Sequence, residues 1–72
     1  MAIERKPIRR GGIRTAGYDR SARVLEIEFD NGNVTQYSGV GEEIARRFLA
    51  SSSPGSYFKD NIDEEFSARR VK

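Results

Sequence analysis

The stretch that most constrains the fold is "VLEIEF", residues 24–29, in which apolar and charged side chains alternate. In an extended chain Leu25, Ile27 and Phe29 fall on one side, and the two glutamates fall on the other. A period of two with one charged face is typical of an antiparallel strand that buries a single face. The segment therefore predicts a sheet with an apolar face that another part of the chain must cover.

The "DNG" that follows predicts a hairpin with a strand over residues 33–38. The loop can hold two residues, "NG", or three, "DNG". Because a slip of one residue exchanges the two faces of a strand, the two-residue loop turns Tyr37 to solvent. The three-residue loop instead places Tyr37 on the apolar face beside Leu25 and keeps Gln36 out of the core. We favour the three-residue loop for that reason.

Two helices are expected after the hairpin. Val40, Ile44 and Phe48 recur every four residues, which indicates one apolar helical face and predicts a helix over residues 42–50. Its first turn holds two glutamates and its end two arginines, which suits the helix dipole and gives two Glu-to-Arg pairs four residues apart. A second helix is expected from Pro54, with Ser53 as N-cap, and its end is open between residues 62 and 66.

Residues 13–18 supply one further strand, so the strands precede the helices in the chain. The expected fold class is α+β: a three-stranded antiparallel β-meander followed by two helices packed on one face. Residues 1–12 are expected to form a flexible basic arm, 13–66 the folded domain, and 67–72 a charged C-terminal tail. Because the arm has no hydrophobic period, we expect deletion of residues 1–11 to leave the melting temperature nearly unchanged.

The composition argues against catalysis. The chain has no cysteine and no histidine, so it lacks the thiolate and imidazole ligands of zinc sites and the usual general base near neutral pH. Its neighbouring carboxylates are best explained as a solvated face. We therefore expect no catalytic residues, no metal and no cofactor. No apolar run approaches the roughly 20 residues of a membrane span, and we expect a cytoplasmic protein.

The charge is unevenly distributed along the chain. Seven basic and two acidic residues lie in residues 1–23, a net +5, whereas six basic and nine acidic residues follow, a net −3. Arginine side chains match phosphate geometry and release counterions when they bind it. The arm is thus either a solubilising tail or a nucleic-acid contact. The residues of interest are Arg5, Lys6, Arg9, Arg10 and Arg14.

The second helix adds two candidates to this set. Most aromatic residues fall on expected apolar faces, but Tyr57 adjoins Phe58, and both cannot point fully inward. A half-exposed Tyr57 could stack on a base, although packing in the core is the default for an aromatic side chain. Lys59 adds a positive charge nearby.

Several motifs together resemble the KTSC domain family. They are "GYD" (17–19), "LEIEF" (25–29), "NG" (31–32), "TQY" (35–37), Val40, and "SSPGSYF" (52–58) before Ile62. Thr35 stands where the family has the first tyrosine of a Tyr-x-Tyr motif, and Gly41 where it usually has proline. The family is small and bacterial, and it also occurs at the C-terminus of some lysyl-tRNA synthetases. The resemblance implies a role in RNA binding.

Two functions follow as expectations. The first is a small non-enzymatic module that binds nucleic acid, RNA in particular, through the arm and nearby arginines. The alternative is a protein–protein interaction module, because an exposed sheet edge can pair with a strand of another chain. Salt separates the two, since binding to phosphates weakens steeply as the salt concentration rises.

Overall fold

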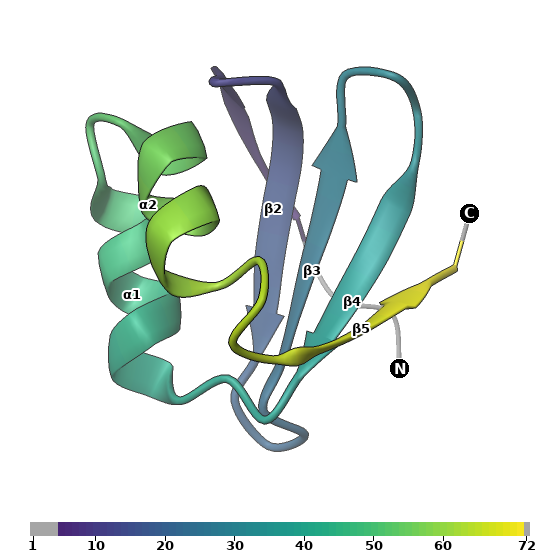
Figure 1. Cartoon of the computed structure of the whole chain (residues 1–72), viewed down its shortest axis with the longest axis vertical. Coiled ribbons are helices and arrows are strands. Elements are labelled where there is room, and N and C mark those ends of the chain that lie inside the picture. Colours follow the sequence, from purple (N-terminus) through teal and green to yellow (C-terminus); the bar gives the residue numbers. More distant parts are fainter. Residues whose placement is uncertain (1–4, 72) are drawn as a thin grey trace.

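A computed structural model of the chain describes residues 5–71. These residues form a five-stranded antiparallel sheet and two helices, in the order β1 (Lys6–Arg10), β2 (Ile13–Asp19), β3 (Val24–Phe29), β4 (Val34–Ser38), α1 (Glu42–Ala50), α2 (Pro54–Asn61) and β5 (Ser67–Arg70). The strands lie in the sheet in the order in which they follow one another in the chain. Both helices cover the same face of the sheet (Figure 1). The α+β class and the position of the helices are as expected.

The expected three-stranded meander is wrong by two strands. Lys6–Arg10, placed in the flexible arm, forms β1, and Ser67–Arg70, placed in the charged tail, forms β5. Both are edge strands, and every side chain of β5 is exposed, so neither needs the apolar alternation by which strands are recognised. Main-chain pairing with β2 and β4 stabilises them instead. Residues 1–4 and 72 of the arm and tail lie outside the described residues.

The β3–β4 hairpin has the three-residue loop. Leu25 lies opposite Tyr37, and the Phe29 N–H donates to the Asn33 carbonyl oxygen at 2.8 Å. Gly32 has a φ of 90°, the left-handed conformation that this loop needs at its last position and that glycine adopts without strain. Tyr37 therefore lies on the apolar face, and its side chain is only 4% exposed.

The two helices begin and end close to the expected residues. In α1 the Glu43–Arg47 pair forms with an N···O distance of 2.6 Å, but Glu42 pairs with Arg20 of the β2–β3 turn at 3.2 Å rather than with Arg46. In α2 the N-cap is Ser53, although its side chain makes no capping hydrogen bond, and the helix ends at Asn61. Of the two ends that the sequence left open for this helix, near residue 62 and near residue 66, the first is thus the observed one.

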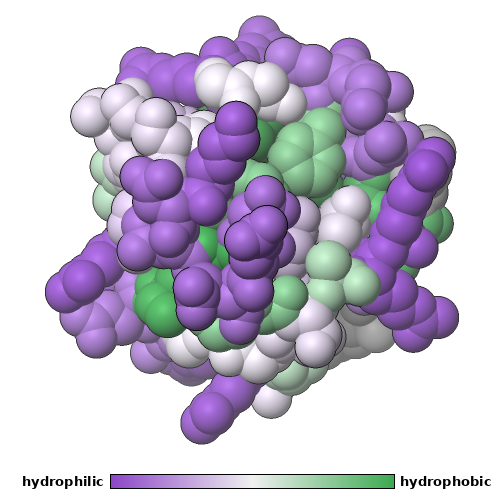
Figure 2. Space-filling model, viewed as in Figure 1, coloured by the Kyte–Doolittle hydropathy of each residue, from purple (hydrophilic) through white to green (hydrophobic). Residues whose placement is uncertain are grey.

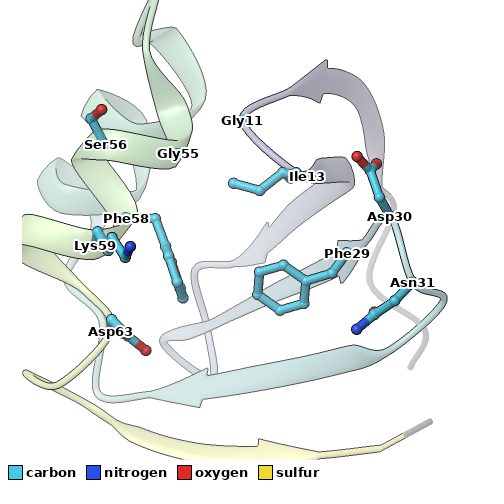
Figure 3. A pocket seen from close by; sticks show the side chains of 11 residues that line it. Gly11, Ile13, Phe29, Asp30, Asn31, Gly55, Ser56, Phe58, Lys59 and Asp63 are labelled. Carbon is cyan, nitrogen blue, oxygen red and sulfur yellow. The ribbon is translucent and has the colours of Figure 1, made fainter.

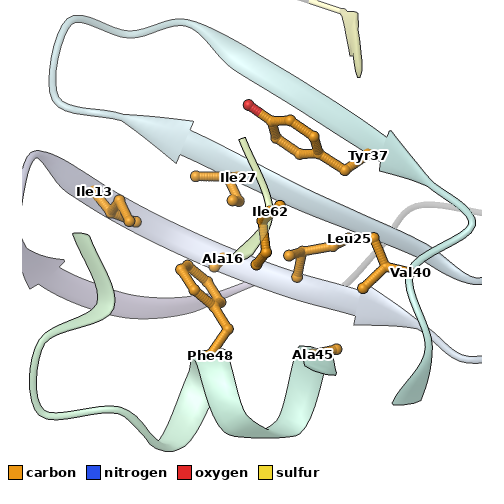
Figure 4. Packing of buried hydrophobic residues seen from close by; sticks show 9 residues of the cluster. All are labelled: Ile13, Ala16, Leu25, Ile27, Tyr37, Val40, Ala45, Phe48 and Ile62. Carbon is orange, nitrogen blue, oxygen red and sulfur yellow. The ribbon is translucent and has the colours of Figure 1, made fainter. Parts of the chain in front are cut away.

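A single hydrophobic cluster lies between the helices and the sheet (Figure 4). Its buried members come from β2, β3, β4, α1 and the segments that flank the helices: Ile13, Ala16, Leu25, Ile27, Tyr37, Val40, Ala45, Phe48 and Ile62. Ile8 of β1 is partly buried against this cluster, which ties the first edge strand to the core. Within residues 5–71, no helix has the length and apolar character needed to cross a membrane.

Candidate nucleic-acid interface

The β1–β2 hairpin distributes the basic residues of the expected arm over two faces and one tip. Lys6 lies opposite Ala16, and Pro7 lies opposite Thr15, before the register shifts ahead of Arg10. Arg9 lies within this irregular stretch and has a φ of 53°, which is uncommon for a residue with a side chain. Because neighbouring strand residues point to opposite faces, the five basic side chains cannot form one continuous surface.

Arg5 lies on the face of the sheet that the helices leave uncovered. Its Nε atom is 3.3 Å from a carboxylate oxygen of Glu26, and its Nη1 atom is 3.9 Å from one of Glu28. Gln36 donates to Glu26 at 2.9 Å, and Thr15 donates to Glu28 at 3.0 Å, so the two carboxylates are fixed in place. The positive charge of Arg5 is therefore offset by two negative charges. This residue does not contribute to a basic surface.

Lys6 lies on the helix side of β1. It lines a hollow of about 420 Å³ together with Tyr18 and residues of α1 that include Glu42 and Arg46. The hollow contains none of the other six candidate residues. Lys6 is thus separated from the hairpin tip.

Arg9, Arg10 and Arg14 come together at the tip of the hairpin, around Gly11 and Gly12. With Asp30 they line a hollow of about 480 Å³. The Nη2 atom of Arg14 donates to the main-chain oxygen of Asp30 at 3.1 Å. Arg10 donates to the main-chain oxygen of Ser52 at 3.4 Å. A carbonyl oxygen carries no net charge, so these bonds orient the two side chains without neutralising them. We call Arg9, Arg10 and Arg14 the hairpin arginines.

A larger cleft of about 650 Å³ adjoins the hairpin arginines and shares Gly11, Gly12 and Asp30 with their hollow. It lies between the β1–β2 turn, the β3–β4 loop and α2, and we call it the aromatic cleft (Figure 3). Ile13, Phe29 and Phe58 point into it, and the Phe29 and Phe58 rings meet edge to face with centroids 5.6 Å apart. On the face of the molecule seen in Figure 2, hydrophobic side chains are visible between hydrophilic ones.

The polar residues of the aromatic cleft stand at its rim. Lys59 and Asp63 approach from the α2 side, and Asn31 approaches from the β3–β4 loop (Figure 3). The side-chain oxygen of Asn31 accepts from the Asn33 N–H at 3.0 Å, which leaves its amide nitrogen as a donor. The rim therefore offers donors and acceptors around an apolar floor, as ligand pockets of this size commonly do.

Two glycines allow the first turn of α2 to approach the β1–β2 tip closely. A Cβ on Gly55 would lie 2.8 Å from the main-chain oxygen of Gly11, and one on Gly11 would lie 2.8 Å from the Gly55 Cα. The first turn of α2 thus contacts the hairpin tip directly, backbone to backbone. The "SPGS" segment at the start of α2 and the "RRGG" segment, which falls in the stretch expected to form a flexible arm, together bring the aromatic cleft and the hairpin arginines side by side.

Tyr57 is half-buried and does not line the aromatic cleft. Its ring packs against Phe48 of α1, with centroids 6.5 Å apart and planes 47° apart. Its neighbour Phe58 is the ring that reaches the cleft. The sequence indicated that the two rings could not both point fully inward, and both are half-buried. Tyr57 stays a prediction as a base-stacking residue, but it is Phe58 that lines the cleft. Of the helix candidates, Lys59 lies at the cleft, where the sequence placed it only as a nearby charge.

Tyr37 lies beside the aromatic cleft, with its ring centroid 5.3 Å from that of Phe58. Burial raises the pKa of the Tyr37 phenol to about 12, and the negative charge of Asp63 acts in the same direction. Burial also raises the pKa of Tyr18, whose hydroxyl donates to the Val40 carbonyl oxygen. Both phenols are therefore protonated near neutral pH, where Tyr18 donates a hydrogen bond and Tyr37 packs on Phe58.

The two edges of the sheet are β1 and β5. Pro7 in β1 has no N–H to offer a further strand, and Arg9 interrupts the regular strand beside it. β5 is four residues long and carries exposed Arg69 and Arg70. Short length, proline, irregularity and charge are the features by which proteins prevent edge-to-edge pairing.

Comparison with known proteins identifies relatives over most of the chain. The sequence model of the KTSC domain family matches residues 11–66. An uncharacterized protein of Stutzerimonas stutzeri is 30% identical over 56 residues, which cover 78% of this chain and 79% of that protein. The crystal structure of a KTSC domain protein from Yersinia pestis has a TM-score of 0.93 and 34% identity, and the match covers 99% of this chain and all of that one.

Proposed function

The chain belongs to the KTSC domain family, and we propose that it is a small non-enzymatic module that binds RNA through the hairpin arginines and Lys59. The proposal includes the cytoplasmic location expected from the sequence. RNA as the ligand agrees with the occurrence of KTSC domains at the C-terminus of some lysyl-tRNA synthetases. It differs from the sequence-based expectation in the residues that carry it, since Arg5, Lys6 and Tyr57 are left out.

The observation that carries the proposal is the gathering of three arginines at the β1–β2 tip. Arg10 and Arg14 donate to main-chain oxygens and so keep their charge for a partner. Phosphate oxygens are the matching partner, because a guanidinium can bind them through two parallel N–H groups. Lys59 extends the positive charge across the neighbouring cleft.

A protein-binding sheet edge has less support. Both edge strands of the described sheet are short and carry proline, an irregular residue or exposed arginines. A basic strand added to β1 or β5 would meet side chains of the same charge. A strand added to β1 would also find the row of main-chain N–H donors interrupted at Pro7.

A binding titration with matched variants tests the proposal. We expect fluorescein-labelled single-stranded RNA to bind the wild type at low salt, and the triple variant Arg9→Gln, Arg10→Gln, Arg14→Gln to bind at least about tenfold more weakly. The loss should be similar for every RNA sequence, because phosphate contacts carry no sequence information.

The control variant is Arg20→Gln, Arg23→Gln, Arg46→Gln. It removes the same charge from exposed residues of α1 and of the β2–β3 turn, at the opposite end of β2 from the hairpin tip. We expect it to bind nearly as well as the wild type. Equal losses in the two triple variants would mean that net charge matters and the hairpin tip does not.

A further inference from the structure

We propose that the aromatic cleft binds one unpaired base of the RNA and prefers guanine. The inference rests on the proposed function and adds a base-recognition site to it. The cleft and the hollow of the hairpin arginines share Gly11, Gly12 and Asp30. A nucleotide whose base enters the cleft would therefore have its phosphates next to the hairpin arginines.

The floor of the cleft suits the face of a base. Phe29 and Phe58 line the cleft and are only half-buried, and the buried Ile13 adds a third apolar side chain to the lining. Unpaired bases are commonly recognised by packing on aromatic side chains, which requires a base that is free of its partner strand. The cleft has a volume of about 650 Å³, within the range of roughly 300–1,000 Å³ typical of small-ligand pockets.

The rim of the cleft suits guanine better than the other bases. Lys59 is a donor and Asp63 an acceptor, and both stand on the α2 side (Figure 3). Guanine presents acceptors at O6 and N7 that a lysine can bind, and two neighbouring N–H donors, at N1 and N2, that a carboxylate can accept together. Adenine, cytosine and uracil each lack this pair of adjacent donors. The donor and the carboxylate on one side of the cleft thus favour guanine.

The test compares four labelled pentanucleotides, UUGUU, UUAUU, UUCUU and UUUUU, by fluorescence anisotropy. We expect UUGUU to bind about tenfold more tightly than the other three, the discrimination that base-edge hydrogen bonds commonly supply. Asp63→Asn should remove this preference. An amide has a single acceptor oxygen, and its NH2 group would face one of the two guanine N–H donors. Asp60→Asn is the matched control, since Asp60 is exposed on α2 and does not line the cleft.

Glycine amide signals in NMR spectra show where the base binds. Gly11, Gly12 and Gly55 line the cleft, and their amides should shift on addition of UUGUU. Gly39 and Gly41 lie beyond the opposite end of β4 from the β3–β4 loop, and their amides should not shift.

Each other outcome overturns the inference. Equal binding of all four pentanucleotides that is lost in the hairpin-arginine variant would leave the RNA-binding proposal standing and reject the base site. A guanine preference that survives Asp63→Asn, or shifts confined to other glycines, would place the base elsewhere. No binding of any pentanucleotide would reject both proposals.

Discussion

At the scale of single residues, Gly11 and Gly55 determine how closely α2 approaches the β1–β2 tip. Gly11 has a φ of 61°, and each glycine lies where a Cβ would come within 3 Å of the main chain of the other. Backbone atoms cannot move aside as the end of a side chain can. The contact therefore fixes the relative position of the hairpin arginines and the aromatic cleft.

We expect Gly55→Ala to lower the free energy of unfolding by about 1–3 kcal/mol, the usual cost of overpacking. Gly41→Ala is the matched control, because a Cβ at Gly41 meets nothing within 4 Å and its φ is −70°. That change should leave stability within about 0.5 kcal/mol of the wild type. Urea unfolding measures both, and equal stability of the two variants would show that the backbone contact is looser than described.

Tyr37 gives the protein a pH-dependent stability in alkaline solution. Its pKa is raised from 10.0 to about 12 in the folded protein. The folded state therefore retains the phenol proton more strongly than the unfolded state does. The resulting contribution is fully present below about pH 10 and is lost as the pH rises towards 12.

We expect the unfolding free energy of the wild type to fall by about 2–3 kcal/mol more than that of Tyr37→Phe between about pH 10 and 12. The phenylalanine variant keeps the ring that packs on Phe58 and removes the titrating hydroxyl. Urea unfolding over a series of pH values provides the measurement. Parallel pH profiles for the two proteins would mean that Tyr37 ionises as easily in the folded as in the unfolded state.

At the scale of elements, the strands that bury one face could be predicted from the sequence, and the edge strands could not. The segment "VLEIEF" shows its period directly, and its "DNG" loop has the predicted length because Tyr37 belongs beside Leu25. In contrast, β1 places one partly buried apolar residue, Ile8, among charged ones, and β5 buries none. Their pairing depends on main-chain groups, which are the same in every sequence.

The structure leads us to predict that removal of the N-terminal arm lowers stability, because residues of the arm form β1 and Ile8 packs against the core. The free energy of unfolding should be about 2 kcal/mol lower for a chain that begins at Gly11 than for one that begins at Arg5, because the shorter chain loses β1 and the burial of Ile8. A chain that ends at Phe66 loses β5, whose side chains are all exposed, and should lose less. Equal melting temperatures for the chains that begin at Gly11 and Arg5 would restore the original expectation.

At the scale of the whole molecule, the fold places the basic residues of the N-terminal segment in different surroundings. The sequence correctly indicated an excess of positive charge near the N-terminus, but spacing along the chain does not show which face of a strand a residue occupies. Arg5 pairs with Glu26 and Glu28, and Lys6 faces α1. The cleft that holds Phe58 and Asp63 depends on the contact between α2 and the hairpin tip, which involves residues far apart in the chain.

The central claim, that the hairpin arginines bind RNA phosphates, is tested most directly by the salt dependence of RNA affinity. For single-stranded RNA, each phosphate contact contributes about 0.7 to the slope of log affinity against log salt concentration. We predict that the slope is about 2 smaller in magnitude for the hairpin-arginine variant than for the wild type and for the control variant. Equal slopes in all three proteins, or no binding by the wild type at about 50 mM salt, would contradict the claim.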